Sequence, residues 1–316
     1  MSDIHICLSY HDGNGTYIKP FFTTLISVLE NTHEYTIFHI FHDDTLHDQS
    51  RTLLENLTNS YACCILFHDM SKFTFTKQKQ LLARYSVASL YRLKIPEVLP
   101  SDVKKTIYLD GDIICALDIK ELWEIALEKQ AVAAALDSEK SRNLFFTYFD
   151  FSKYMNFEKY FNSGVLILNL DKLRSSYPNL YDDSLRILSE HPEWDAADQN
   201  PLNIIFQDDC LFLDNRFNHI SVDYRPESVK DLYGFIWHFA GIHKPWVYKN
   251  NLADFLYWHY FKKTPFGDTE EKLFIEQRMV KDGTLDNLIL TYPLGSRKLF
   301  VKRLFYRLFT KRNGGQ

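Results

Sequence analysis

The sequence lacks the features of an exported, membrane-spanning or disulfide-stabilised protein. It has only 5 cysteines in 316 residues, in odd number and without C-x-x-C spacing, so neither a disulfide framework nor a cysteine zinc site is expected. It has no N-terminal basic stretch followed by an apolar one. It also has no apolar run near the roughly 18 residues that a membrane span needs. We expect reduced thiols and a cytoplasmic protein, either soluble or peripheral on a membrane.

Acidic residues are missing from the C-terminal tail, since none follows Asp286. The net charge of −5 is the sum of +7 in residues 287–316 and −12 in the rest of the chain. Between 297 and 312, basic residues alternate with Phe, Leu and Val so that a helix would have one apolar and one cationic face. This pattern favours an anionic membrane surface as the partner. A helix packed on the domain is the alternative, RNA binding is weaker, and no nucleic acid is expected.

Short β-branched apolar runs alternate with helical patterns in the first half of the chain, which predicts an α/β domain with a mostly parallel, buried sheet. The 46% hydrophobic content excludes general disorder. A helix is predicted over 17–30, where apolar residues recur at helical spacing. The predicted strands are 4–10, 35–41, 63–67, 106–109 and 131–136.

The second half is less regular, with predicted strands at 165–170 and 234–239 and helices at 181–188 and 198–206. No repeat or low-complexity linker interrupts it. We predict one catalytic domain over 1–250, a helical appendage over 251–294, and the basic amphipathic tail over 295–316.

The first strand ends in a loop with Gly13 and Gly15, at the edge where open α/β sheets bind ligands. The loop matches neither G-x-G-x-x-G nor a P-loop, so an ordinary glycine-rich turn is the alternative.

The strongest chemical signal is Asp110-Gly111-Asp112, which directly follows the predicted strand 106–109. A buried strand delivers both carboxylates to one sheet edge, and glycine allows the backbone to pass closely around an ion. Two hard oxygen ligands suit Mn²⁺ or Mg²⁺, which would bridge them to a diphosphate. An Asp-Gly hairpin turn is the alternative.

A second cluster comprises His238, Gly241 and Lys244 at the end of another strand-like run. A neutral imidazole is a suitable third ligand for Mn²⁺, and lysine supplies a point charge for phosphate. By itself, His238 is more often a hydrogen-bonded core residue.

Small polar residues form a third group, at 160–164 before an apolar run and at Asp198 and Gln199 where a helix opens. Such residues can hold sugar hydroxyls. A helix-capping role for Asp198 is the alternative.

Six segments, taken in this order, resemble glycosyltransferase family 8. They are 86–96, 107–112, 160–166, 198–199, 215–218 and 238–246. The resemblance covers about residues 4–250. It implies a GT-A fold with a Rossmann-like nucleotide-sugar-binding sheet, a UDP-hexose donor, and Mn²⁺ held by Asp110, Asp112 and His238. The diphosphate would lie against Gly241 and Lys244, and Gly111 is a further expected donor contact.

The resemblance also assigns residues to the rest of the donor. It places Gln199, Asp198 and Asp137 at the reacting sugar, with Gln199 nearest the face opposite the leaving UDP. Further donor contacts are expected from Arg92, Asn162, Ser163, Gly164, Tyr10, Asp12, Asn14 and Tyr17. The first loop departs from the family's usual Asp-Asp-Asn-Tyr, since this chain has His-Asp-Gly-Asn-Gly-Thr-Tyr at 11–17.

The implied activity is a retaining transfer of glucose or galactose to a hydroxyl of lipopolysaccharide or another lipid-linked glycan, on the inner face of the cell membrane. Because glutamine is a poor nucleophile, front-face attack is favoured over a covalent intermediate. The acceptor would meet the segments 138–159 and 221–231. Transfer to a glycoprotein such as a surface adhesin, or a non-catalytic binding scaffold, is the alternative.

Overall fold

The chain folds around a seven-stranded sheet with strand order β3-β2-β1-β4-β7-β6-β8. The computed structural model describes residues 3–73, 86–194, 198–221, 226–241, 244–247 and 252–267. The predicted tail 295–316 and most of the predicted appendage lie outside these ranges. The strands are β1 (Ile4–Tyr10), β2 (Thr36–His42), β3 (Cys63–Asp69), β4 (Lys105–Leu109), β6 (Val132–Leu136), β7 (Phe161–Asn169) and β8 (Cys210–Leu213).

A smaller sheet lies beside the large one and has the order β5-β10-β9. Its strands are β5 (Ile113–Cys115), β9 (His219–Ile220) and β10 (Ile236–His238). β10 runs antiparallel to β5 and parallel to β9. Because β4 and β5 pair with different sheets, the chain between them is not a hairpin turn.

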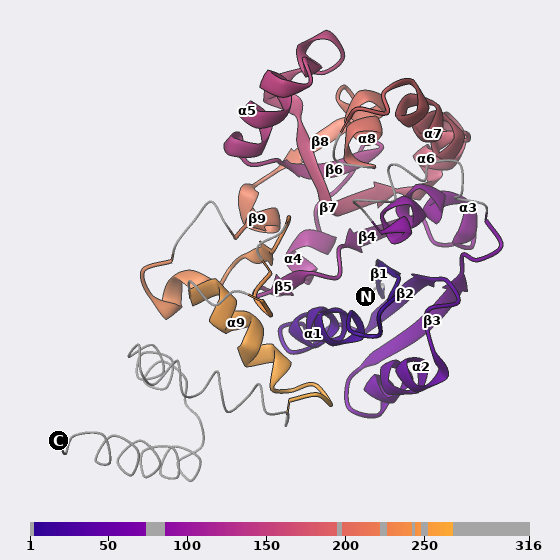
Figure 1. Cartoon of the computed structure of the whole chain (residues 1–316). Coiled ribbons are helices and arrows are strands. Elements are labelled where there is room, and N and C mark those ends of the chain that lie inside the picture. The colour runs from indigo at the N-terminus through magenta and orange to yellow at the C-terminus, as the bar shows by residue number, and fades with distance from the viewer. Residues whose placement is uncertain are drawn as a thin grey trace.

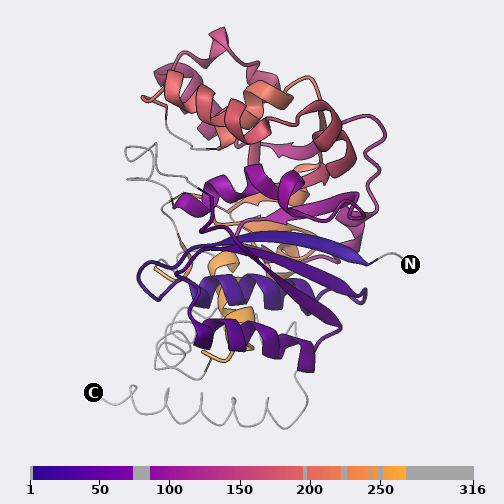
Figure 2. The ribbon, with the colours of Figure 1, turned by 90° about the vertical axis from the view of Figure 1, so that its right-hand side faces the viewer.

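Helices cover both faces of the large sheet (Figures 1 and 2). Ile6 and Leu8 of β1 point into a core shared with α1 and α9, whereas Cys7 points into a second core shared with α7 and α8. This alternation is the period of two expected of a strand buried on both faces. The helices are α1 (Ile18–Leu29), α2 (Asp48–Glu55), α3 (Ile95–Val98), α4 (Lys120–Trp123), α5 (Glu139–Tyr148), α6 (Leu170–Ser176), α7 (Leu180–Glu190), α8 (Gln199–Phe206) and α9 (Leu252–Phe261).

The first helix, α1, is buried at every residue except Lys19, because the sheet covers one side and α9 packs against another. Ala253 and Phe255 of α9 therefore belong to the same core as β1. The first part of the predicted appendage thus packs on the main domain.

The mixed α/β architecture with a predominantly parallel sheet confirms the predicted fold class. One strand departs from the expected arrangement: β7 runs antiparallel to both β4 and β6, and it is the only described strand of the large sheet to do so. β7 also begins at Phe161 and not at 165, so Asn162, Ser163 and Gly164 lie within the strand. An irregular register between Ala134 and Leu136 of β6 extends the pairing to Phe161.

Candidate functional site

Three strand ends bring the strongest candidate ligands together. Asp110 directly follows β4, Asp112 directly precedes β5, and His238 is the last residue of β10. The β10–β5 pairing aligns His238 with Ile113, and the Phe239 N–H donates to the Asp112 carbonyl at 3.1 Å. The two sheets therefore hold the histidine against the carboxylate pair.

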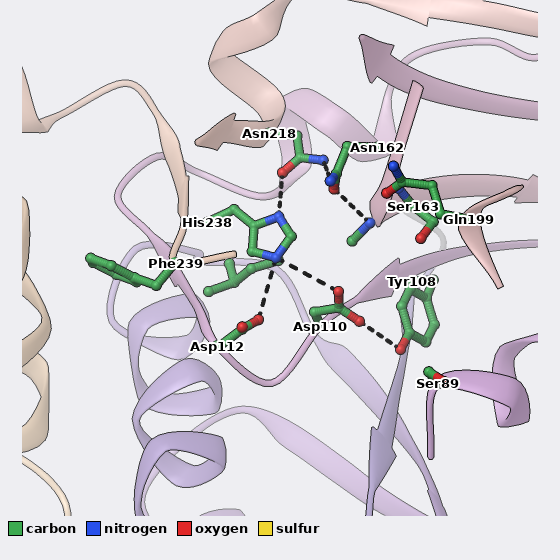
Figure 3. Close-up of polar contacts among 12 residues, drawn as sticks. Ser89, Tyr108, Asp110, Asp112, Asn162, Ser163, Gln199, Asn218, His238 and Phe239 are labelled. Carbon is green, nitrogen blue, oxygen red and sulfur yellow. Dashed lines mark hydrogen bonds and ion pairs between the residues drawn. The ribbon is translucent and has the colours of Figure 1, made fainter. Parts of the chain in front are cut away.

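The ligand atoms of Asp110, Asp112 and His238 all lie within 4.8 Å of one another. The Nε2 atom of His238 is 3.7 Å from Asp110 Oδ2 and 3.4 Å from Asp112 Oδ1 (Figure 3). The buried Oδ1 of Asp112 has no hydrogen-bond donor among the described residues. Since an unpaired buried carboxylate oxygen is costly, this set of two carboxylates and one imidazole fits a divalent cation.

Lys244 places a positive charge beside the two carboxylates. Its Nζ pairs with Asp112 Oδ2 and donates to the Phe239 carbonyl at 2.7 Å. Burial alone would raise the pKa of Asp112, but Lys244 and His238 hold that pKa below its usual range. Asp112 is therefore a carboxylate at neutral pH, as a metal ligand must be.

Two glycines are required here because neighbouring side chains occupy the space of a Cβ. A Cβ on Gly111 would meet the Tyr17 hydroxyl, and it would lie 2.9 Å from Phe21 Cδ2. A Cβ on Gly164 would meet the His238 ring, and it would lie 2.8 Å from Asp110 Oδ2. A glycine at 111 is thus required by close packing against Tyr17 and Phe21, in addition to any role beside an ion.

Arg92 connects the metal-ligand group to the sugar-side candidates. Its Nη2 donates to Asp110 Oδ1 at 2.7 Å, and its guanidinium stacks on the Tyr108 ring at 4.2 Å. Its Nε lies 3.1 Å from Asp198 Oδ2, an ion pair without a well-directed hydrogen bond to that oxygen. Burial raises the pKa of Asp198 to about 6, against the opposing effect of Arg92. Although Asp198 precedes α8, its side chain accepts no helix-capping hydrogen bond.

Gln199 is held by three hydrogen bonds in one orientation. Its Nε2 donates to Asp137 Oδ2 at 2.7 Å and to the Tyr160 hydroxyl at 3.1 Å, while its Oε1 accepts from the Ser163 N–H at 3.1 Å. Burial raises the pKa of Asp137 above its usual range even though Gln199 donates to it. The predicted catalytic residues Gln199 and Asp137 thus form one connected polar group.

In the first loop, the predicted donor contacts Asp12 and Tyr10 form hydrogen bonds that stabilise the loop itself. Asp12 is buried and accepts from the backbone N–H groups of Thr16 at 2.8 Å and Ile18 at 3.0 Å, which shapes the entry to α1. Tyr10 lies beneath the loop, where its hydroxyl donates to Asp12 at 3.1 Å. Asn14 is exposed and accepts from the Thr16 hydroxyl at 2.6 Å.

One cleft of about 1370 Å³ joins these groups, and it exceeds the roughly 300–1000 Å³ of common ligand pockets. Tyr10 is the only predicted site residue that does not line it. Lys140, Ser141, Leu144 and Phe145 line it from α5, within the predicted acceptor segment. Those predicted site residues that line it are Asp12, Asn14, Tyr17, Arg92, Asp110, Gly111, Asp112, Asp137, Asn162, Ser163, Gly164, Asp198, Gln199, His238, Gly241 and Lys244.

Two residues at the site were not among the sequence candidates. The Tyr108 hydroxyl donates to Asp110 Oδ1 at 2.9 Å, and Asn218 Oδ1 lies 2.9 Å from His238 Nδ1 (Figure 3). Tyr108 lies in β4, two residues before Asp110, and this spacing is the available signal. Asn218 lies in the family-like segment 215–218, but no sequence spacing links it to His238.

The family model described as "Glycosyl transferase family 8" matches residues 7–250. The chain belongs to this family. A putative glycosyltransferase of Haemophilus influenzae is 26% identical over 244 residues, covering 73% of this chain and 70% of that protein. The lipopolysaccharide 1,2-glucosyltransferase of Escherichia coli is 27% identical over 172 residues, covering 51% of this chain and 50% of that protein.

Solved structures of glycosyltransferases share the fold of this family member. The galactosyltransferase LgtC, in complex with donor and acceptor sugar analogues, matches with a TM-score of 0.68 at 20% identity, covering 85% of this chain and 98% of that chain. The glycosyltransferase GlyE of Streptococcus pneumoniae matches with a TM-score of 0.61 at 18% identity, covering 89% of this chain and 64% of that chain. The fold is therefore GT-A, and this family member is a glycosyltransferase whose class uses a nucleotide-sugar donor and a glycan acceptor.

Among the described helices, none is both long and apolar enough to cross a bilayer.

Proposed function

We propose that this glycosyltransferase moves glucose or galactose from a UDP-sugar to a hydroxyl of a glycan acceptor, with retention of the α-configuration and with Mn²⁺ or Mg²⁺ bound. The observation that carries the proposal is the convergence of Asp110, Asp112 and His238 at one part of a cleft that also contains Gln199 and Asp137. The cleft is large enough for a donor together with part of an acceptor.

A divalent cation held by Asp110, Asp112 and His238 would supply positive charge to the leaving diphosphate. Lys244 adds a second cation at the same place, since it already pairs with Asp112. Preorganised charge of this kind is often the largest contribution to catalysis. No strong base in the protein is then required to expel UDP.

The proposal of a front-face, retaining reaction is supported by the chemistry and hydrogen bonding of the candidate nucleophile, Gln199. Gln199 has an uncharged carboxamide held by Asp137, Tyr160 and the Ser163 N–H. The bond from the anomeric carbon to the β-phosphate oxygen breaks on the same face on which the bond to the acceptor oxygen forms. The acceptor hydroxyl passes its proton to the departing phosphate oxygen.

The test is release of UDP from UDP-glucose and from UDP-galactose, each with Mn²⁺ or with EDTA. Mn²⁺-dependent release from one donor would support the proposal and identify the sugar. Asp112→Asn should abolish that release, and near-normal rates in this variant would contradict the proposed site. If the wild-type protein neither releases UDP from either donor nor binds UDP, the scaffold alternative is favoured. With an acceptor, a β-linked product by NMR would contradict retention.

The proposed acceptor is a lipopolysaccharide or another lipid-linked glycan at the inner face of the cell membrane. Support comes from the basic amphipathic sequence of 297–312 and from similarity to a protein named lipopolysaccharide 1,2-glucosyltransferase. Deletion of 295–316 should abolish binding to phosphatidylglycerol vesicles while leaving UDP release intact. Unchanged vesicle binding would contradict the tail assignment.

A further inference from the structure

A series of hydrogen bonds through two asparagine side chains connects the backbone of β7 to the imidazole of His238. The Gly164 N–H donates to Asn162 Oδ1 at 2.9 Å, and Asn218 Nδ2 donates to the same oxygen at 2.9 Å. Asn218 Oδ1 in turn lies 2.9 Å from His238 Nδ1 (Figure 3). All three side chains are buried.

The direction of every bond in this series is set by its first member. A backbone N–H can only donate, so the Asn162 atom that faces Gly164 must be oxygen. The Asn218 atom that faces this oxygen must then be the NH₂ nitrogen, which turns the Asn218 oxygen toward His238. An amide oxygen can only accept, so Nδ1 of His238 carries the hydrogen.

The consequence falls on the other ring nitrogen. In the neutral ring with hydrogen on Nδ1, Nε2 carries the lone pair. Nε2 is the atom that lies 3.4 Å from Asp112 Oδ1 and 3.7 Å from Asp110 Oδ2. The opposite tautomer would point a hydrogen at the cation position, and the ring would not be a ligand.

The hydrogen-bonded series also reaches the sugar side of the cleft, because the Asn162 side chain lowers the pKa of the neighbouring Asp137 carboxyl. With its oxygen held by Gly164 and Asn218, Asn162 has its NH₂ group left to interact with that carboxylate. Asn162 therefore has a structural role beside the sugar contact that the family resemblance implies, and it also lines the cleft.

We propose that Asn218 and Asn162 are positioning residues that set the tautomer of His238 and so prepare Nε2 to bind the cation. The inference rests on the proposed function for the metal, but it makes a separate statement about the metal-free protein. Partners of this kind typically change metal affinity by about 10–100-fold when removed.

The first measurement is the tautomer of His238 in the metal-free, full-length protein, by long-range ¹H–¹⁵N NMR at about pH 8, where an ordinary imidazole is neutral. His238→Gln identifies the signal. We expect hydrogen on Nδ1 in the wild type and a mixture of tautomers in Asn218→Ala. Hydrogen on Nε2 in the wild type would overturn the proposal, whatever the enzyme's activity.

Asn162→Ala is the sharper variant because Asn162 does not touch His238. Without it, the Asn218 amide can turn over and present its NH₂ to Nδ1, which moves the hydrogen to Nε2. Asn218→Asp keeps an acceptor for Nδ1 and should preserve the wild-type tautomer, although it loses the hydrogen bond to Asn162 Oδ1 because a carboxylate oxygen cannot donate. An unaltered tautomer in both alanine variants would overturn the proposal.

The second measurement is Mn²⁺ affinity by electron paramagnetic resonance. Asn218→Ala should weaken it by about 10–100-fold and Asn218→Asp should largely restore it. The matched control is Asn31→Ala, which loses hydrogen bonds to Ser27, Cys115 and Tyr260, none of which lines the cleft. Equal affinities in Asn218→Ala and Asn31→Ala would overturn the proposal. Absence of Mn²⁺ binding in the wild type would contradict the proposed function, while the tautomer result would stand independently.

Discussion

His238 and a row of three histidines on the large sheet all form hydrogen bonds through ring nitrogens, but only the bond of His238 defines which nitrogen carries the hydrogen. His238 is joined to a backbone N–H through two amides, which fixes its tautomer. On β1, β2 and β3, His5 Nδ1 lies 2.9 Å from His39 Nε2, and His39 Nδ1 lies 3.0 Å from His68 Nε2. Among the described residues, no backbone group fixes the direction of this histidine row. An imidazole becomes a defined ligand only where a group of fixed polarity sets its hydrogen.

The histidine row is also set apart by its surroundings. Its neighbouring rings stack with centroids 5.2 Å apart. Burial lowers the pKa of His39 to about 3, and it lowers the pKa values of His5 and His68. The charges of Asp3 and Asp102 raise the pKa of His5 against this effect of burial, while His42 and Lys72 lower the pKa of His68 further. The row is therefore neutral near pH 7 and bridges three strands of the sheet.

The largest expected difference between the two groups is in catalysis. His238→Gln removes a proposed metal ligand and should lower UDP release by on the order of 100-fold or more. His39→Gln, which disturbs only the row, should leave release by the folded protein unchanged. Steady-state rates at saturating Mn²⁺ check this, with circular dichroism to confirm folding. Equal losses in the two variants would remove the distinction.

A smaller effect is expected when the space around His238 is filled. Gly164→Ala places a methyl group against the His238 ring and Asp110. Relief of this contact should cost about 1–3 kcal/mol of stability and displace the ring from the carboxylates. Thermal unfolding and Mn²⁺ binding measure the two consequences. Wild-type values in both would show that the strand can accommodate a side chain here.

At neutral pH the smallest effect is expected for the histidine row, where a loss of stability should appear only in acid. Because the folded pKa of His39 is below the unfolded value, the unfolded state binds more protons, and stability falls as pH decreases below about 6.5. For His39 the loss by pH 4.5 is roughly 2–3 kcal/mol. His39→Leu should flatten the pH dependence of the unfolding free energy by about this amount, as measured by urea titration. An unchanged slope would mean that other groups dominate acid unfolding.

The sequence predicts which residue types gather at the site better than it predicts the hydrogen bonds between them. Asp110, Asp112 and His238 could be predicted because each lies at the end of an apolar run, and strand ends meet at sheet edges. Asn218 could not be linked to His238, since their contact depends on the pairing of β9 with β10. The histidine row could not be predicted from the sequence either. His5, His39 and His68 become neighbours only through the stagger of three parallel strands.

The reversed direction of β7 has a consequence for how this protein can vary. Because β6 and β7 are antiparallel, β6 ends and β7 begins at the same edge of the sheet, beside Asp137 and Asn162. The segment between them, 138–160, must leave and return over the cleft, and α5 lies within it. Its length and composition can change without moving the strands that carry Asp110 and His238. We therefore expect changes in this segment to alter the proposed acceptor contacts without displacing the proposed metal ligands.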